Sequence, residues 1–444
     1  MALDVSSTHS TSTAELEAQA ERHFRWNAVV FVLDSLAFSI GQAFANGSTV
    51  LPAFVSQLTD STLFIGLLST VQSGSWLLPQ VAAASLMAGK PRKRPYMLIG
   101  AVFSRPAFAF LAALLFFAGA SSPSLLLAGL FASLALFNGA DGLCAVAWFD
   151  IFAKAIPPHR RGRLQGLSQL ITGPVSVGLG GIVGYVLASP NLPFPSNFMV
   201  LFVLAGVGYT LNLAALALYR EPVGVPTGSS HAESRFLQLL LPILRHDSRF
   251  RRLVALRLAF GVGITSLPFY IVYAQQELGF SPEHIGLFLS CQLGGGTLAG
   301  LGLGQIADRF GTRAAVRLAL AIGALSPGLA VLVHFGGGIL GPALIPVVAL
   351  IFLANGAMIA SSQIGFMNYV LEIAPHDQRS TYAGLYNTIN GTLLVVPILI
   401  GWLLETVSYQ AVFGAIFLLL LVALAGSAML TEPRYQRAKD RQAP

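Results

Sequence analysis

The sequence predicts an all-helical integral membrane protein, in which twelve transmembrane helices form two six-helix repeats. Three observations support this fold class: the composition, the length of the apolar runs and an internal repeat. Hydrophobic residues make up 55% of the 444-residue chain and charged residues only 10%, whereas soluble domains carry about 25% charged residues. So few charges cannot cover a water-facing surface, and the alternating pattern typical of a membrane β-barrel is missing.

Twelve apolar runs are each long enough to cross a bilayer, which takes about 20 residues of helix. In the first half of the chain, the expected helices are residues 27–54, 62–87, 96–119, 124–154, 164–188 and 198–219. In the second half, they are residues 250–275, 283–305, 314–334, 341–370, 380–404 and 409–430. The runs 124–154 and 341–370 are longer than a bilayer requires, so we expect them to tilt or to project beyond it.

The positive charges predict the orientation of these helices. Of the 26 Lys and Arg residues, 24 fall in loops, tails and helix ends on one side of the expected membrane, and the five short loops on the other side carry none. By the positive-inside rule, both termini are cytoplasmic, and we expect the plasma (inner) membrane. The net charge of +7 is therefore a sign of topology and of contact with the lipid bilayer, and it predicts no nucleic acid partner.

The remaining composition excludes several other classes. Residues 1–25 contain no apolar core, so we expect a disordered cytoplasmic tail and no signal peptide, and residues 431–444 form a second cytoplasmic tail. Cys144 and Cys291 both lie in expected helices, so neither a disulfide nor a metal site is expected. The chain has no Walker A phosphate-binding loop and no nucleophile–base pair. We therefore expect no enzyme, no cofactor and no ATP-driven pump.

Two stretches of the chain repeat each other with a shift of about half its length. Residues 157–167, PPHRRGRLQGL, align with residues 375–385, PHDQRSTYAGL, at a shift of 218. The tripeptide Ile-Gly-Leu at residues 65–67 recurs at residues 285–287, at a shift of 220. Matches that recur in order indicate a duplicated unit.

The repeat divides the chain into an N-terminal six-helix bundle at residues 26–219 and a C-terminal bundle at residues 250–430. Residues 220–249 join them as a cytoplasmic linker. The linker contains the flexible stretch GVPTGSSH, followed by an amphipathic segment, SRFLQLLLPILRHDSRF. We expect the amphipathic segment to lie on the inner membrane surface.

Residues 304–313, GQIADRFGTR, place an acid, two arginines and two glycines between two apolar runs. Glycine allows the tight turn that a short loop between membrane helices needs, and the charges stay at the water boundary. The stretch resembles the loop signature of the major facilitator superfamily. The resemblance implies two six-helix halves that rock about a central site and expose it to each side in turn. It also implies that the first and fourth helices of each half line the cavity.

The same resemblance implies a cytoplasmic gate. Asp308 is expected to pair with Arg309, with Arg313 and with a helix N-terminus, and so to hold the cytoplasmic side shut. The corresponding loop of the first half, residues 88–95 (AGKPRKRP), has no acid, so we predict an asymmetric gate. The expected gate residues are Gly304, Asp308, Arg309, Gly311, Arg313, Asp150, Arg161 and Arg379.

Two further charges lie near the inner boundary, and we favour local pairing or structural roles for them. Asp150 is close to a basic loop and is expected to pair with Arg160 or Arg161 as part of the gate. Arg257 lies only two turns from the inner face in the expected helix 250–275. Its side chain can reach the surface, and we favour a structural role.

Asp34 lies eight residues after Trp26, about 12 Å along the first expected helix. Ionisable groups inside membrane helices are costly and often functional. In the interpretation that we favour, its carboxylate takes up and releases a proton as the cavity opens to each side. The resemblance supports this role, because proton-coupled exporters of the family often carry an acid in this helix. In the other interpretation, Asp34 is a fixed partner of Arg25 or Arg257.

Arg105 and Asp141 lie near the middle of two other expected helices. In one interpretation, Arg105 contacts an anionic substrate and Asp141 binds a proton or a cation. In the other, the two form a structural ion pair. We favour the structural role for Arg105, and both interpretations stay open for Asp141, whose helix is expected to line the cavity. Asn138, Asn355 and Gln363 are candidate polar contacts for the substrate.

These features predict a secondary transporter that moves a small organic molecule by alternating access, with proton antiport, and hence export, as the preferred coupling. Residues 173–184, GPVSVGLGGIVG, resemble the exporter motif of the family with one extra residue. The few polar residues on the expected cavity helices favour apolar or amphipathic cargo. The alternatives are an uptake symporter or uniporter of the same fold, and a non-transporting membrane sensor or scaffold. We expect a monomer whose partners are the substrate, protons and lipid.

Overall fold

The structure, a computed structural model, describes most of the chain. The described backbone covers residues 5–223, 242–375 and 378–433. Side chains are described from residue 15 onward within these ranges, apart from those of residues 363 and 380. Most of the amphipathic segment expected in the linker, and most of the C-terminal tail, therefore lie outside the described residues.

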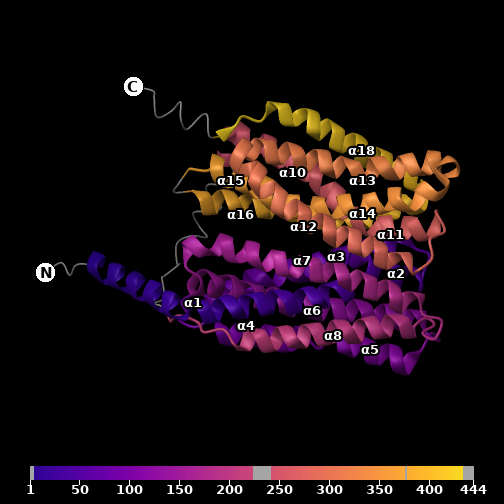
Figure 1. Cartoon of the computed structure of the whole chain (residues 1–444). Helices are drawn as coiled ribbons and strands as arrows, with labels where there is room; N and C mark the ends of the chain where they lie inside the picture. The colour runs from indigo at the N-terminus through magenta and orange to yellow at the C-terminus, as the bar shows by residue number, and fades with distance from the viewer. Residues whose placement is uncertain (1–4, 224–241, 376–377, 434–444) are drawn as a thin grey trace. The chain divides into compact units, whose positions relative to one another are not determined.

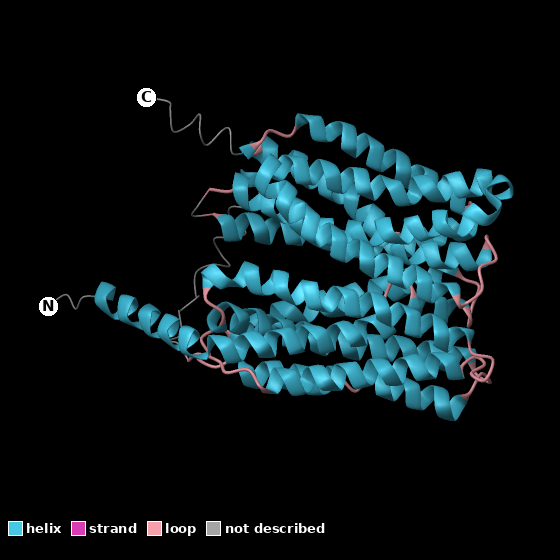
Figure 2. Cartoon of the chain, viewed as in Figure 1, coloured by secondary structure: helices cyan, strands magenta, loops and turns pink. Residues whose placement is uncertain are grey.

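All the secondary structure in the described ranges is helical (Figures 1 and 2). Ten helical runs in these ranges are long and apolar enough to cross a membrane. One of them, Thr312–Ile373, contains two of the expected membrane helices. The helix expected at residues 62–87 is also present, as α3 (Thr62–Met87). The predicted all-helical membrane fold with twelve membrane helices is therefore confirmed.

The described chain divides into two compact units, and each is described on its own. Unit 1 comprises Met1–Asn46, Val71–Leu179 and Val186–Ser230. Its helices are α1 (Val5–Phe44), most of α3, α4 (Arg94–Ser104), α5 (Ala107–Ala118), α6 (Pro123–Ala155), most of α7 (Pro158–Ala188) and α8 (Ser196–Ala217). α1 packs along α8, and α4 packs along α6. A core cluster that includes Phe31, Met97 and Ile151 joins α1, α4 and α6, the helices that carry the polar groups of the site.

Two helices of unit 1 differ from the sequence predictions. The expected helix 96–119 is split into α4 and α5 at Arg105 and Pro106. Proline lacks a backbone N–H, and its ring displaces the preceding turn, so the break places Arg105 at the end of α4. α1 is helical from Val5, across residues that were expected to form a disordered tail. The Glu and Ala residues there favour helix, whereas the expectation depended on the missing apolar core.

Unit 2 comprises Gly47–Thr70, Gly180–Tyr185 and His231–Pro444. Its helices are α2 (Val50–Ser56), α10 (Ser248–Thr265), α11 (Leu267–Gln276), α12 (His284–Phe310), α13 (Thr312–Leu340), η1 (Gly341–Ala343), α14 (Leu344–Ser361), η2 (Ser362–Met367), α15 (Asn368–Ile373), α16 (Arg379–Asn390), η3 (Gly391–Val395), α17 (Val396–Thr406), α18 (Tyr409–Gly426) and η4 (Ser427–Met429). α12 packs along α14. A Cβ at Gly356 would lie 1.7 Å from the carbonyl oxygen of Gln292, so only glycine allows this approach.

The membrane helices of unit 2 are broken at several points. The expected helix 250–275 breaks at Ser266, just before Pro268. The expected helix 341–370 contains the π-helix η2, and the expected helix 380–404 contains the 3₁₀ turn η3. Departures of this kind from regular α-helix are frequent at functional sites.

Unit 2 also includes three pieces of the first half of the chain. The expected helix 27–54 breaks after α1, and α2 belongs to unit 2. The start of α3 and a short part of α7 belong to unit 2 as well. These pieces pack against helices of the second half within one compact unit.

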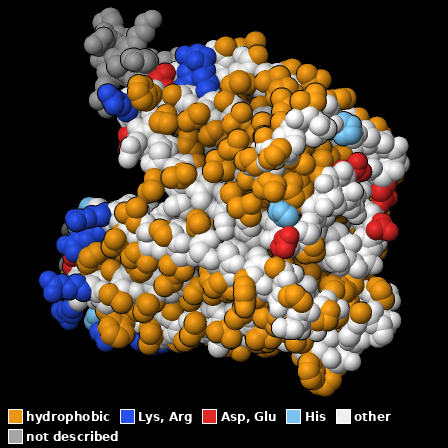
Figure 3. Space-filling model, turned by 45° about the vertical axis from the view of Figure 1, so that its right-hand side comes forward, with side chains coloured by type: hydrophobic (Ala, Val, Ile, Leu, Met, Phe, Trp, Pro, Cys, Tyr) orange, Lys and Arg blue, Asp and Glu red, His pale blue; other side chains and the backbone are white. Residues whose placement is uncertain are grey.

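Large apolar side chains are exposed along the helices. In unit 1 they include Val81, Phe110, Phe116 and Phe117, the last of which is 83% exposed. Hydrophobic side chains form broad patches on the face in view, and the Lys and Arg side chains gather on the left of this view (Figure 3). Such side chains face acyl chains in a bilayer, so this is the surface of an integral membrane protein.

Candidate functional site

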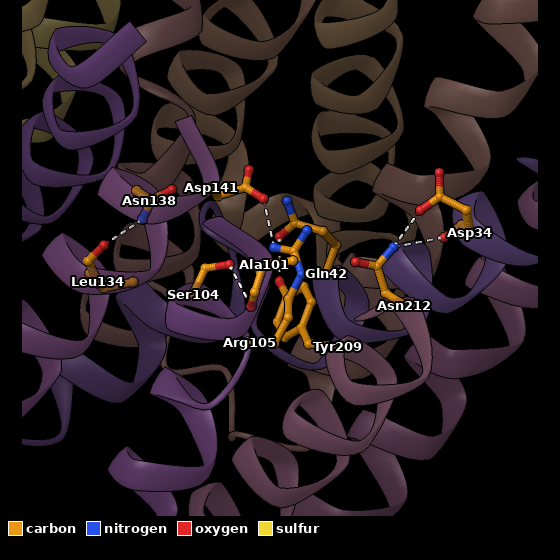
Figure 4. Close-up of polar contacts among 10 residues, drawn as sticks. All are labelled: Asp34, Gln42, Ala101, Ser104, Arg105, Leu134, Asn138, Asp141, Tyr209 and Asn212. Atoms are coloured by element: carbon orange, nitrogen blue, oxygen red, sulfur yellow. Dashed lines mark hydrogen bonds and ion pairs between the residues drawn. The ribbon is translucent and has the colours of Figure 1, made fainter. Parts of the chain in front are cut away.

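Asp34, in α1, accepts hydrogen bonds from three neutral side chains of unit 1. The Nδ2 of Asn212, on α8, donates to Oδ1 of Asp34 at 2.6 Å (Figure 4). The indole Nε1 of Trp148, on α6, donates to Oδ2 at 2.8 Å, and the hydroxyl of Tyr219, just beyond α8, donates to the same oxygen at 3.1 Å. One carboxyl group therefore ties α1 to α6 and to the end of α8.

The surroundings of Asp34 are apolar. The residue is 5% exposed, and the rings of Phe31 and Phe152 stack on the Trp148 indole with centroids 6.0 and 5.5 Å away. Among the described residues of unit 1, no cationic side chain lies within 4.0 Å of the Asp34 carboxylate. The fixed pairing with Arg25 that the sequence left open is therefore not found. A carboxylate held only by neutral donors can gain or lose a proton without leaving a partner cation unpaired.

Arg105 and Asp141 form a buried ion pair in unit 1. Nη1 of Arg105 donates to Oδ1 of Asp141 at 2.6 Å, and the two side chains are 4% and 14% exposed (Figure 4). The guanidinium of Arg105 also lies over the rings of Phe38, Phe137 and Tyr209, between 5.4 and 5.8 Å from their centroids. The sequence left open whether these residues bind substrate and protons or form a structural ion pair, and the structure shows the ion pair. These contacts hold both charges fixed.

The three amides that were expected to contact the substrate have different settings. Asn138 donates from Nδ2 to the Leu134 carbonyl oxygen of its own helix at 2.9 Å (Figure 4). Asn355 is 1% exposed, and its Oδ1 has no hydrogen-bond partner among the described residues. The side chain of Gln363 lies outside the described residues. Only Asn138 therefore shares unit 1 with Asp34. In the described part of the chain, no group of three or more His, Cys, Asp or Glu is placed to hold a metal ion.

Asp150 pairs with a different cation from the one predicted. Its carboxylate lies 2.5 Å from Nζ of Lys154, one turn further along α6. Arg160 instead pairs with Glu21 of α1 at 3.2 Å, and Nε of Arg161 donates to a backbone carbonyl at 2.9 Å. The prediction was wrong because a residue four positions along a helix lies on the same face and is the nearer partner.

The turn between α12 and α13 is formed by Gly311, whose φ of +90° favours glycine. The side chain of Glu432 lies against this turn, and a Cβ at position 311 would come within 2.4 Å of its carboxylate. Glu432 accepts a hydrogen bond from the backbone N–H of Arg313 at 3.2 Å, and Nη2 of Arg313 donates to the carbonyl oxygen of Ala428 at 2.9 Å. Glu432 therefore meets the N-terminus of α13, where a negative charge is favourable.

The loop of the first half has the same arrangement. Glu221 accepts hydrogen bonds from the backbone N–H groups of Lys93 and Arg94 at 2.7 and 2.9 Å, at the start of α4. Nη2 of Arg94 donates to the carbonyl oxygen of Ala217. Each loop thus receives an acid from beyond the last helix of its own half, whereas the asymmetry predicted from Asp308 stays a prediction. The sequence signal, which we missed, is that Glu221 and Glu432 are both followed by proline.

The other expected gate residues occupy different positions on α12 and α16. Asp308 and Arg309 are exposed on the last turn of α12, and the guanidinium of Arg309 lies 5.6 Å from the Phe310 ring. Gly304 lies within α12, and a Cβ there would meet no atom within 4 Å. Arg379 begins α16, and its Nε has no partner among the described residues. The pairing predicted for Asp308 stays a prediction.

Unit 2 contains close contacts between pieces of the two halves of the chain. The hydroxyl of Thr62, at the start of α3, donates to the carbonyl oxygen of Gly401 on α17 at 2.7 Å. A Cβ at Gly66 would lie 2.3 Å from a carbonyl oxygen near the start of α17. A Cβ at Gly286, on α12, would lie 2.3 Å from the backbone nitrogen of Gly184 on α7. Glycine therefore allows two backbone-to-backbone contacts that a larger residue would separate.

The chain sequence matches the family described as Major Facilitator Superfamily over residues 33–394 and 275–444. The chain belongs to the Major Facilitator Superfamily. The match includes Asp34, both charges of the buried ion pair and the loop at residues 304–313, and it confirms the resemblance that this loop first suggested. A search among curated proteins gave no match.

Solved structures confirm the superfamily fold. A D-xylose-proton symporter is similar with a TM-score of 0.66 and 14% identity, over 91% of this chain and 98% of that one. A bacterial homologue of the iron transporter ferroportin, in an inward-facing state, is similar with a TM-score of 0.65 and 14% identity, over 91% and 98% of the two chains. A mutant of the nucleoside transporter NupG has a TM-score of 0.64 and 14% identity, over 94% and 100%. At such identity the likeness concerns the fold alone.

Proposed function

We propose that this superfamily member is a secondary transporter that moves a small organic molecule by alternating access, driven by protons. The observation that carries the proposal is the carboxyl group of Asp34, buried among three neutral donors. A paired cation would hold such a group ionised, whereas neutral donors leave both protonation states accessible. Ionisable groups of this kind inside membrane helices often serve as proton sites.

Protonation of Asp34 changes how firmly α1 is held. The ionised carboxylate accepts hydrogen bonds from Trp148, Asn212 and Tyr219 at the same time. A protonated carboxyl group uses one oxygen as a donor, so it satisfies fewer of these partners. The contacts of α1 with α6 and α8 then weaken. Proton uptake is thereby linked to helix movement, which is what a proton-driven transporter needs.

For the direction of transport, we propose export by proton antiport. The stretch at residues 173–184 supports export because it resembles the exporter motif, with Pro174 inside α7 and Gly184 in close contact with Gly286. Uptake by symport is the second candidate and would use the same carboxyl group of Asp34. The two differ in the direction in which a pH gradient moves the cargo.

We also propose that both termini are cytoplasmic and that the protein lies in the plasma (inner) membrane, from the placement of 24 of the 26 basic residues. In this orientation the contacts of Thr62 with α17, and of Gly184 with α12, are on the outer side. Alternating access requires that they separate when the site opens outward. The substitutions Gly66→Leu and Gly286→Val would then keep the outer side open.

The experiment uses the purified full-length protein in proteoliposomes with an imposed pH gradient. A compound mixture is added outside, and accumulated compounds are identified by mass spectrometry. An antiporter accumulates its cargo in the more acidic compartment, because protons leave in exchange, whereas a symporter accumulates it in the more alkaline one. In Asp34→Asn, an isostere that cannot carry the proton, we expect accumulation to fall to equilibrium while exchange of cargo for cargo persists.

The matched control is Asp60→Asn, which removes an exposed acid and is expected to leave the accumulation unchanged. Accumulation by Asp34→Asn at the level of the unsubstituted protein would mean that Asp34 is not the coupling group. If no compound moves, and labelled protein shows no ligand-driven switching, the sensor or scaffold alternative takes the place of the transporter.

A further inference from the structure

Arg257 is a charged residue inside a membrane helix of unit 2. It lies nine residues after the start of α10, about 14 Å along the helix. The run Ser248–Gln276, to which α10 belongs, is long and apolar enough to cross a membrane. A charge at this depth is costly unless something compensates for it.

The guanidinium of Arg257 lacks the compensation that Arg105 has. Its Nε and Nη1 are shielded from solvent, and neither has a hydrogen-bond partner among the described residues. Within the described part of unit 2, no carboxylate lies within 4.0 Å of it. The residue as a whole is only partly buried. A structural arginine, as Arg105 is, carries a carboxylate partner.

The groups around Arg257 form a mixed polar and aromatic setting. The rings of Phe260 and Phe366 lie 5.8 Å from the guanidinium carbon, and both residues are fully buried. On α16, the Tyr386 hydroxyl interacts with the Arg257 side chain and with that of Asn390. Tyr386 is 4% exposed, whereas Asn390 is partly exposed. One positive charge, a phenol and an amide thus stand beside two apolar rings.

We propose that Arg257, with Tyr386 and Asn390, binds the carboxylate of an amphipathic monoanionic cargo. A single guanidinium balances a single negative charge, and hydroxyl and amide donors suit the second oxygen of a carboxylate. The buried rings of Phe260 and Phe366 make the surroundings of this site apolar, which suits a cargo that carries an apolar body beside its carboxylate. This inference rests on the proposed transport function and names its substrate class.

The test uses the full-length protein in detergent, without a pH gradient. The probes are straight-chain and aryl-alkyl monocarboxylates, each paired with its neutral amide, together with inorganic phosphate, and binding is followed by thermal stabilisation. We expect at least one carboxylate to bind, and its amide and phosphate to bind much more weakly. In Arg257→Gln the affinity for that carboxylate falls about 10- to 100-fold, because a charge-assisted hydrogen bond is lost. Arg257→Lys recovers part of it.

Arg252→Gln is the matched control, because Arg252 is an exposed arginine of the same helix, and it is expected to leave the affinity unchanged. Without ligand, Arg257→Gln is expected to melt at the same temperature as the unsubstituted protein or higher, since an unpaired charge has been removed. A lower melting temperature would indicate a structural arginine and overturn the proposal. So would equal binding of carboxylate and amide, preferential binding of phosphate, unchanged affinity in Arg257→Gln, or no binding by any carboxylate.

The test of the Arg257 site can fail independently of the test of proton coupling by Asp34. If Asp34→Asn loses gradient-driven accumulation while Arg257→Gln binds carboxylates normally, only the anion site fails. If carboxylates bind through Arg257 but no pH gradient drives any of them, only the proton coupling fails.

Discussion

Asp34 and Asp141 are both enclosed in unit 1, but their partners differ. Asp141 lies 2.6 Å from the guanidinium of Arg105. Asp34 accepts hydrogen bonds only from neutral side chains, and no cationic side chain of the described unit lies within 4.0 Å of it. Two aspartates of the same helical unit therefore have different partners: one has a cation and the other has neutral donors.

The different partners affect how easily each carboxylate can change its charge. Protonating Asp141 leaves the buried Arg105 without its partner, and an unpaired buried charge costs several kcal/mol. Protonating Asp34 leaves no cation unpaired, because its donors are neutral. This difference supports a fixed structural role for the pair and the proton-carrying role that we propose for Asp34.

Breaking the fixed pair should give the largest effect. Arg105→Gln leaves the Asp141 carboxylate without its cation, so we expect a loss of about 3–5 kcal/mol in the free energy of unfolding. The double variant Arg105→Gln/Asp141→Asn should recover most of this loss. Unfolding of the full-length protein in detergent measures both. Equal stability of the single and double variants would show that the pair is not the stabilising unit.

Neutralising the ion pair and neutralising Asp34 should have different effects on proton-driven transport. The double variant Arg105→Gln/Asp141→Asn is expected to keep proton-driven accumulation in proteoliposomes. Asp34→Asn should reduce accumulation by about tenfold or more and lose less stability than Arg105→Gln, since its amide oxygen still accepts hydrogen bonds from the donors on one side and no charge is left unpaired. The opposite pattern, with coupling lost only in the double variant, would transfer the proton role to Asp141.

Removing one neutral donor should tune the proton site without abolishing it. Trp148→Phe keeps an aromatic ring beside Phe31 but removes the N–H that stabilises ionised Asp34. The ionised form becomes less favourable, so protonation occurs at higher pH. We expect the pH of half-maximal transport to rise by about one unit. A profile unchanged in Trp148→Phe would mean that this hydrogen bond does not affect the transported proton.

Glu221 and Glu432 differ from both aspartates, because each places its carboxylate at the N-terminus of a helix. Glu221→Gln and Glu432→Gln should each cost about 0.3–1 kcal/mol of stability, because the contact with α4 or α13 is retained but its charge is lost. The two costs should be similar, as the contacts are. Thermal unfolding of both variants measures this, and a cost confined to Glu432→Gln would support the asymmetric gate.

The fold could be predicted from the sequence because it depends on long apolar runs and on a repeat that survives in short motifs. The breaks were less predictable. Pro106 and Pro268 explain two of them, whereas the π-helix at Ser362–Met367 contains no proline and has no sequence signal that we recognise. Breaks of this kind depend on packing between helices, which single-sequence patterns do not contain.

The charged members of the site could also be predicted, because an acid or arginine within an apolar run stands out. Their partners could not. Trp148 and Asn212 lie 114 and 178 residues from Asp34 along the chain, and only the fold brings them together. Glu221 and Glu432 were missed because they lie just beyond the expected helices, in segments treated as linker and tail.

The most direct test of the account is infrared difference spectroscopy of the full-length protein between alkaline and acidic pH. Protonation of a buried carboxylate produces the C=O stretch of a carboxylic acid. The other acids of the chain also contribute to this band. We predict that its size on acidification is similar in the unsubstituted protein and in the double variant Arg105→Gln/Asp141→Asn, and that it is smaller in Asp34→Asn. A band of unchanged size in Asp34→Asn would contradict the assignment of Asp34 as the proton carrier.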